Sequence, residues 1–393
     1  MKVLLYTPTV NRGGVHRVVE TLFPAFISEF PDVEFEVLGQ EFDEIGLKIE
    51  YPCAFSAMPP YGQLPPHPHQ FPYLLANHGR FYAHLERKSR DFDVIYCPVP
   101  WWTMGFTRWT LKVPFVTTLS DFAFDVIDMG MLADHFRSAV RKMRPHVSAF
   151  VVHSRYWKQH AEERYQLPNV HVVEHTPDFV TPNFNPTVAE GERVRAKYNL
   201  PNNYILAFHC YGHKDPETII KGYQWALYIN RDIPNLVLGG IGTESYIEGA
   251  PIQSGAESHV HEVRRLLRSL PMGSYHIVGT IPEEDVAGLY NGAVAAISAS
   301  LSEGDLPGTA FEAVQSYVPF VCSDFPIFTE KLGDDCAWIF ERRNATMLAE
   351  RLIEACTTDV KKKVERAAAK LARRNAINVA QDYMNIFRSV SRD

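Results

Sequence analysis

The side chains best suited to chemistry gather in one stretch in the last third of the chain. Glu303 and Asp305 lie in a loop between an apolar run and a helical stretch, and Glu312 lies within that helical stretch. Amides at a helix N-terminus lack partners and carry the positive end of the dipole, so the helix start near Gly308 and Thr309 suits a diphosphate. A carboxylate beside it can accept hydrogen bonds from sugar or ribose hydroxyls. The alternative is that the acidic residues only complement the helix dipole.

Two basic side chains follow an apolar run near the middle of the chain. His209 comes directly after residues 204–208, and Lys214 follows it in the same loop. A lysine supplies a point charge for a diphosphate. Histidine is a weaker cation at neutral pH because its ordinary pKa is about 6.5. The alternatives are that Lys214 is a solvated loop lysine and that His209 is a polar residue at the end of a strand.

The elements that position these residues alternate along the chain. Short apolar runs are separated by amphipathic helical stretches, an order typical of parallel sheets covered by helices. Strands are predicted at residues 3–7, 33–38, 94–99, 115–119, 149–153, 170–174, 204–208, 236–239, 276–278, 295–298 and 320–322. Helices are predicted at residues 15–30, 217–228, 259–270, 284–291, 309–316 and from 345 onwards. The pattern predicts an α/β fold in which two Rossmann-like, doubly wound domains face each other across a central cleft.

Length and a proline-rich segment predict where the domains divide. A chain of 393 residues is too long for one ordinary core. Residues 177–186 hold three prolines and interrupt the pattern. We therefore predict a first domain over residues 1–183 and a second over residues 184–375. Because ligands of open α/β sheets sit at the carboxyl ends of the strands, we expect the ligand between the two domains.

Residues 53–72 differ from the rest of the first domain. Paired prolines lie among histidines and aromatic residues, which excludes a regular helix or a central strand and predicts a surface loop or lid. His67 and His69 have no cysteine or carboxylate at a convincing metal-ligand spacing. Asp91 and Asp93 form a D-x-D pair of the kind that binds a divalent ion, but they precede a strand instead of following one. We predict no metal site.

Composition narrows the class of protein. The formal net charge is -7 and the pI is about 6.2, so the basic face of a duplex nucleic-acid binder is not expected. The 6 cysteines are scattered, which favours a reducing cytosol over a disulfide framework or a zinc site. No stretch approaches the ~20 apolar residues that span a bilayer. We predict a cytoplasmic protein whose membrane contact, if it has one, is peripheral at the inner face.

The stretch around the acidic loop resembles the retaining GT-B glycosyltransferases of family 4, a group with many bacterial polysaccharide and lipopolysaccharide enzymes. The Glu303-Gly304 pair, Glu312 and residues 318–324 follow the order of the family's motif. The resemblance implies that the first glutamate contacts hydroxyls of the donor sugar and the second contacts the donor ribose. Eight residues separate the two glutamates here instead of seven. Either the loop is one residue longer, or Asp305 takes over part of the first glutamate's role.

The resemblance continues upstream in the second domain. Residues 276–302 resemble the stretch in which the family holds the base of the nucleotide with a loop and a helix. That role falls to four residues here: Ile281, Pro282, Val286 and Leu289. An ordinary turn followed by an amphipathic helix is the alternative. Lys214 matches the family's lysine at the diphosphate, and His209 stands where arginine is common.

The first domain resembles the family as well. Gly13 and Gly14, after the first strand, resemble the loop that faces the donor phosphates, although glycine pairs also occur in ordinary turns. Residues 115–121 resemble a strand that usually ends in His-Asp, and Ser120 replaces that histidine. Asp121 is then a candidate for binding donor or acceptor hydroxyls, with a helix-capping role as the alternative.

The resemblance covers about residues 1–355 and implies that the last helix, residues 376–393, packs back on the first domain. It predicts a retaining hexosyltransferase with Glu303, Asp305 and Asp121 as candidate catalytic residues. The hexosyl group would pass from a nucleotide-sugar, with a UDP-sugar such as UDP-glucose favoured, to a glycan or lipid-linked saccharide acceptor in polysaccharide biosynthesis. No metal or cofactor is expected. A GT-B epimerase or phosphorylase, and a two-lobed sugar-binding protein without catalytic activity, are the alternatives.

Overall fold

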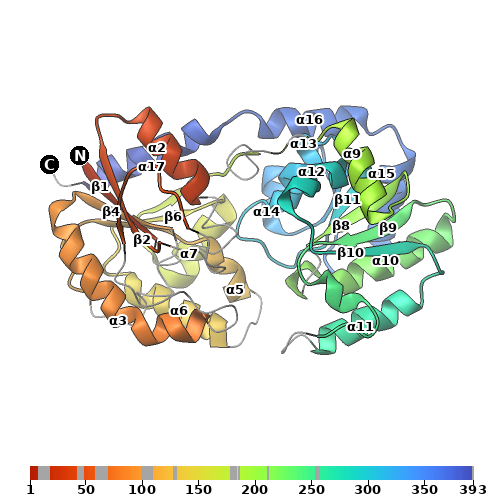
Figure 1. Ribbon diagram of the computed structural model, residues 1–393, viewed down its shortest axis with the longest axis horizontal. Coiled ribbons are helices and arrows are strands. Elements are labelled where there is room, and N and C mark those ends of the chain that lie inside the picture. The colour runs from red at the N-terminus through yellow and green to blue at the C-terminus, as the bar shows by residue number, and fades with distance from the viewer. Residues whose placement is uncertain are drawn as a thin grey trace. The chain divides into compact units, whose positions relative to one another are not determined.

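The computed structural model describes residues 1–7, 18–41, 48–57, 70–98, 109–126, 131–177, 184, 186–209, 212–252 and 257–391. The chain forms two compact units, and Figure 1 colours them by residue number from red at the N-terminus to blue at the C-terminus. The first unit combines Met1–Val180 with Arg374–Asp393, and the second is Thr181–Arg373. The chain passes from the first unit to the second inside the proline-rich segment that was predicted as the linker. Among the described helices, none is both long and apolar enough to cross a bilayer.

A parallel sheet forms the centre of the first unit. In the described residues its strands lie in the order β3-β2-β1-β4-β5-β6-β7, and each neighbouring pair is parallel. The strands are β1 (Lys2–Thr7), β2 (Glu34–Gly39), β3 (Ala54–Ala57), β4 (Val94–Cys97), β5 (Phe115–Thr118), β6 (Ala149–Val152) and β7 (Val170–Val172). The central strands β4, β5 and β6 are buried at every position, as expected of strands covered on both faces. The predicted α/β pattern is confirmed here.

Helices connect these strands, and one comes from the far end of the sequence. The helices are η1 (Val18–Leu22), α2 (Phe23–Glu29), α3 (Gln70–Lys88), η2 (Ser89–Asp91), η3 (Ser120–Phe122), α5 (Ala123–Val126), α6 (Met131–Met143), α7 (Arg155–Tyr165) and α17 (Ala376–Val390). α17 lies beside α2 in Figure 1, and the ring of Phe26 contacts those of Tyr383 and Phe387 at centroid distances of 6.1 and 5.6 Å. Tyr383 Oη also lies 2.9 Å from Thr118 Oγ1. α17 is therefore part of the first unit's core.

The second unit repeats the design around its own parallel sheet. Its described strands lie in the order β10-β9-β8-β11-β12-β13. They are β8 (Tyr204–Phe208), β9 (Asn235–Gly239), β10 (Tyr275–Gly279), β11 (Ala293–Ser298), β12 (Phe320–Ser323) and β13 (Trp338–Phe340). The helices are α9 (Val188–Tyr198), η4 (Gly212–Lys214), α10 (Pro216–Ile229), η5 (Thr243–Tyr246), α11 (Glu257–Arg268), α12 (Glu283–Asn291), α13 (Gly308–Gln315), α14 (Pro326–Lys331), α15 (Ala345–Thr357) and α16 (Lys361–Leu371). Both units are thus doubly wound, as predicted.

One local prediction was wrong in part, one helix differs in type from the prediction, and one strand was missed. The segment predicted as a loop or lid over residues 53–72 begins with β3 and ends in α3, while residues 58–69 lie outside the described part of the chain. Ala54–Ala57 contains no proline, and an edge strand needs hydrogen bonds on one side only. The helix predicted over residues 15–30 is confirmed over the described residues 18–29, but its first turn is π-helical and only Phe23–Glu29 is α-helical. The edge strand β13 was missed because its run of three residues is too short to show a period.

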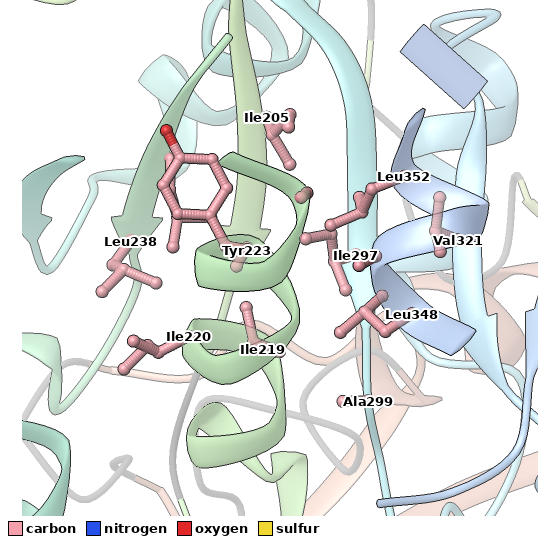
Figure 2. Packing of buried hydrophobic residues seen from close by; sticks show 14 of the residues in the cluster. Ile205, Ile219, Ile220, Tyr223, Leu238, Ile297, Ala299, Val321, Leu348 and Leu352 are labelled. Carbon is pink, nitrogen blue, oxygen red and sulfur yellow. The ribbon is translucent and has the colours of Figure 1, made fainter. Parts of the chain in front are cut away.

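The core of the second unit brings two helices unusually close together over one face of the sheet. Figure 2 shows Tyr223 of α10 and Leu348 of α15 among the buried side chains that cover the central strands. A Cβ atom added at Gly222 of α10 would lie 2.6 Å from Cδ2 and 2.7 Å from Cγ of Leu348. Glycine is therefore needed at this helix crossing for steric reasons, although it lowers helix propensity.

We expect Gly222→Ala to destabilise the protein by about 1 kcal/mol. The added methyl overpacks the core at a cost of roughly 1–3 kcal/mol, which outweighs the gain of up to ~1 kcal/mol in helix propensity. Gly79→Ala in α3 is the matched control, because a Cβ there meets nothing within 4 Å. Urea unfolding of both variants measures the difference. A Gly222→Ala protein as stable as the Gly79→Ala protein would contradict the close approach of α10 and α15.

Candidate active site

In the second sheet, the direction in which successive strands are added changes between the neighbouring strands β8 and β11. The chain continues from β8 to β9 on one side and from β11 to β12 on the other. Loops that leave neighbouring parallel strands in opposite directions open a crevice at their carboxyl ends, where ligands of such sheets bind. The loop after β8 carries Lys214, and the loop after β11 carries Glu303. Leu301 N donates to His213 O over 2.9 Å, so the two loops are tied together.

Lys214 and Glu303 form an ion pair in this crevice. The Lys214 ammonium donates to Glu303 Oε1, which also accepts from Ser300 Oγ over 2.5 Å. Only 13% of the lysine side chain and 9% of the glutamate side chain are exposed. Withdrawing two charges from water is costly, and it is tolerated only with good geometry and additional hydrogen bonds. The pair that the sequence assigned separately to diphosphate and sugar is therefore one preorganised unit.

Serine side chains support this pair from the ends of β11 and β12. Ser298 Oγ lies 3.0 Å from Ser300 Oγ, and Ser323 Oγ donates to Ser300 O over 2.7 Å. All three serines are buried. The network fixes the backbone that carries Ser300, and through it the position of the Glu303 carboxylate. Sequence reasoning missed these serines, because short hydroxyl side chains at strand ends carry no distinctive spacing.

Asp305 has a different partner. Its Oδ1 accepts from the ammonium of Lys331 at the end of α14 and from Leu306 N over 2.7 Å. Lys331 is buried, with 7% of its side chain exposed. The sequence around Lys331 mixes polar and apolar residues, so no pattern marked this lysine as buried. The pair anchors α14 to the loop before α13, and it distinguishes Asp305 from Glu303, which pairs with another lysine.

The helix predicted to receive a diphosphate starts beside these loops. α13 begins at Gly308, its N-cap residue is Pro307, and no side chain caps it. Helix-start amides that no side chain caps are available to an anion or to water. Tyr290 Oη donates to Thr309 O over 3.3 Å and holds the first turn in place. Glu312 lies in the second turn and is buried, with 7% of its surface exposed.

The two histidines of the loop after β8 differ in their surroundings. His209 adopts a left-handed backbone with φ 58°, and its N donates to Gly239 O over 2.8 Å. A Cβ added at Gly240 would lie 2.8 Å from both N and Nδ1 of His209, so only glycine fits there. Burial, with the charge of Lys214, lowers the pKa of His213 to about 4. His213 is thus neutral at pH 7, and Lys214 supplies the positive charge of this loop.

The residues predicted to hold a nucleotide base lie along the loop after β10 and α12. Ile281 and Val286 are each 9% exposed, Leu289 is fully buried, and Pro282 is the exposed N-cap of α12. Leu289 therefore belongs to the interior beneath the loop. Glu244, which the sequence did not single out, accepts from the backbone amide of Thr280 over 2.5 Å.

A buried carboxylate positions α12. Asp285 Oδ1 accepts from Arg193 over 2.7 Å, and Oδ2 accepts from Lys197 over 2.5 Å and from Tyr198 Oη over 2.7 Å. All three partners belong to α9, and Tyr198 is its last residue. Burial of Asp285 acts to raise its pKa, but the hydrogen bonds from Lys197, Tyr198 and Arg193 prevail and lower it to about 2. α9 therefore holds the helix that follows the predicted base loop.

The candidates in the first unit are described only in part. Ser120 and Asp121 lie in η3, directly after β5 at the carboxyl edge of the sheet. The side chain of Asp121 lies outside the described residues, as do Gly13 and Gly14. Asp91 and Asp93 are exposed at the amino end of β4, and Lys2 N donates to Asp93 Oδ2 over 2.7 Å. His67 and His69 also lie outside the described part of the chain.

Known proteins resemble this chain in sequence over the first unit and in fold throughout. The model of the family described as Glycosyltransferase Family 4 matches residues 12–178. Sucrose-phosphate synthase from Thermosynechococcus elongatus superposes with a TM-score of 0.72 at 17% identity, over 99% of each chain. HepE from Anabaena in complex with UDP and glucose gives 0.69 at 14%, over 99% of this chain and 100% of that one. A glycosyltransferase from Rickettsia africae gives 0.67 at 17%, over 99% and 98%. No curated protein sequence matches.

These comparisons show the fold of the chain and a family match over part of it. Residues 12–178, less than half of the chain, match the family 4 model, and the whole chain has the GT-B fold of two Rossmann-like domains. The predicted fold is therefore confirmed, and the match over residues 12–178 favours a glycosyltransferase.

We expect Asp285→Asn to lower the free energy of unfolding by about 2 kcal/mol at pH 7. The folded-state pKa of Asp285 is about 2, below the usual value near 4, so the ionised carboxylate stabilises the fold above pH 4. This stabilisation is lost as the pH falls from about 4 towards 2. Urea unfolding across this pH range should show the gap between wild type and variant closing.

Glu284→Gln is the control for this experiment. Glu284 is the exposed neighbour of Asp285, and only its backbone carbonyl accepts from Arg193. Its substitution should change stability by less than about 0.5 kcal/mol. A gap between wild type and Asp285→Asn that stays constant from pH 7 to pH 2 would rule out the assigned role of the Asp285 charge.

Proposed function

We propose that this protein is a retaining hexosyltransferase that uses a UDP-sugar donor and a glycan or lipid-linked saccharide acceptor. The observation that carries the proposal is the buried Lys214–Glu303 pair beside the uncapped start of α13. A positive ammonium, helix-start amides and a carboxylate together match the three parts of a nucleotide-sugar: diphosphate, leaving group and sugar hydroxyls.

The donor is proposed to lie along the carboxyl edge of the second sheet. Lys214 and the amides near Gly308 and Thr309 would bind the diphosphate, and Glu312 would bind the ribose. Glu303 would bind hydroxyls of the transferred sugar. A lysine ammonium has three donors, so Lys214 can keep its bond to Glu303 while it binds phosphate oxygens. Hydrogen-bond donors that are fixed in advance stabilise the charge that develops on the leaving phosphate. In many enzymes such electrostatic stabilisation is the largest contribution to the rate enhancement.

Three further assignments complete the proposal. Asp305 would shape the loop through Lys331, which leaves Glu303 in the role of the first glutamate of the family motif. His209 would lie near the diphosphate, and Ile281, Pro282 and Val286 would contact the base, with Leu289 supporting them from below. Gly13, Gly14 and Asp121 of the first unit remain proposed contacts of donor and acceptor. The positive charges of the site would take the place of a metal, so no metal or cofactor is required.

Uridine is proposed as the donor base, with glucose as the sugar to test first. The solved structures of HepE from Anabaena hold UDP, UDP with glucose, or UDP-glucose, and their fold covers nearly the whole chain. The retaining outcome rests on the likeness to family 4. The acceptor would be a saccharide in polysaccharide biosynthesis, and a cytoplasmic location supplies the nucleotide-sugar.

The protein is expected to bind UDP in preference to GDP. Saturating UDP should raise the melting temperature by several degrees, because a ligand that binds only the folded state stabilises it. Incubation with a panel of UDP- and GDP-sugars and saccharide acceptors, followed by mass spectrometry, tests transfer directly. An epimerase would change the sugar of the donor without an acceptor, and a sugar-binding protein would not bind either nucleotide. Either result would reject the transferase proposal.

Lys214→Ala and Glu312→Ala should each lower kcat/KM for the donor by about 100-fold or more. Loss of Lys214 removes the positive charge at the proposed diphosphate, and loss of Glu312 removes the proposed ribose contact. The melting temperature of each variant shows that it is folded. The matched control is Lys221→Ala, in the neighbouring helix α10, where the side chain is 43% exposed and pairs with Glu217 across one turn. Full activity of both site variants would overturn the site assignment.

A further inference from the structure

We propose that the outer face of α16 is a docking surface for an anionic lipid membrane. The feature that leads to this inference is a concentration of positive charge. Residues 361–374 contain seven lysines and arginines and one acidic residue, Glu365, in a chain with a formal net charge of -7. The inference rests on the proposed function only in that a lipid-linked acceptor would be presented at such a surface.

The helix buries one side and exposes the other. Val364 and Ala367 are buried and face the core of the second unit. Lys362, Arg366 and Arg373 are exposed, and Arg373 lies in the turn directly after the helix. Their spacing of four and seven residues places them in one stripe along the helix axis. α16 runs along the edge of its unit in Figure 1, and the exposure of the three side chains shows that the stripe lies on the surface.

Other cations of the same segment contact the protein itself. The Lys363 ammonium lies 4.2 Å from the centroid of the Trp338 ring, and burial lowers the pKa of Lys363. Lys370 Nζ donates to Leu332 O over 3.0 Å. In contrast, the Lys361 side chain is 77% exposed, and its ammonium lies 4.0 Å from Glu365 Oε1. Arg366 does both: its side chain is 58% exposed, and its Nη1 lies 4.0 Å from Asp335 Oδ2. The segment therefore holds cations that fix the helix and cations that remain exposed to solvent.

A membrane surface is the partner that this pattern fits best. The exposed stripe contains Ala369 and no aromatic residue, whereas single-stranded nucleic acid is bound on stacking aromatics. A stable protein partner would need a buried aromatic or apolar anchor, which the exposed side of α16 does not contain. A plane of anionic headgroups needs only exposed lysines and arginines. The predicted contact is therefore electrostatic, without insertion into the bilayer.

The experiment is co-sedimentation of the full chain with vesicles of two compositions at low and high salt. One set contains phosphatidylcholine alone, and in the other about a third of the lipid is phosphatidylglycerol. We expect binding to the anionic vesicles only, and loss of that binding when the salt is raised. Charge reversal by Lys362→Glu, Arg366→Glu and Arg373→Glu together should weaken binding at least tenfold.

A matched control separates this surface from the effect of overall charge. Lys48→Glu, Arg90→Glu and Arg268→Glu change the net charge equally at exposed cations elsewhere. This triple variant should bind anionic vesicles much more tightly than the α16 variant does. Transfer to a soluble acceptor should be unchanged in both variants, because no substituted residue belongs to the proposed site.

The proposal is overturned if the wild type does not bind the anionic vesicles. It is also overturned if the α16 variant binds as well as the wild type, or if both triple variants lose binding equally. Tighter binding to a single-stranded DNA oligomer than to vesicles at the same salt would identify a different partner and would reject it as well. Vesicle binding is independent of catalysis, so a failure of the proposed transferase activity is recognised separately.

Discussion

The candidate site depends on the burial of opposite charges where two neighbouring parallel strands part. Lys214 and Glu303 lie 89 residues apart in the sequence, and neither could be buried alone without a large loss of hydration energy. The hydrogen bond from Ser300 and the backbone contact between His213 and Leu301 make their pairing possible. The loops after β8 and β11 are therefore held together before any ligand arrives.

Other carboxylates extend this arrangement to the surrounding elements. Asp305 ties the loop after β11 to α14 through Lys331, and Asp285 ties α12 to α9. Glu244 joins the loop after β9 to Thr280 at the end of β10. Each carboxylate takes its partner from a different element, so the site rests on a connected scaffold. Polar groups held in place in this way can stabilise developing charge without reorganising during the reaction.

The sequence predicted most of the fold because the underlying signals are local. β8 was placed correctly over residues 204–208, and the last helix, predicted over residues 376–393, is α17 over Ala376–Val390. Their apolar periodicity lies within a few neighbouring residues. The loop predicted for residues 53–72 was wrong at β3, which lies at the edge of the described sheet and pairs with β2. An edge strand of four residues has too little local pattern to be recognised, and its pairing is decided by the neighbouring strand.

The sequence by itself determined the chemical types at the site: a lysine after β8, acidic residues after β11, and a helix start with glycine before Glu312. These follow from strand and helix patterns and from the order of motifs shared with family 4. Only the tertiary structure decided which charges meet. It paired Glu303 with Lys214 and Asp305 with Lys331, a lysine that no pattern had marked. Such pairings join residues far apart in the chain, and they depend on strand order and helix packing, which local periodicity does not encode.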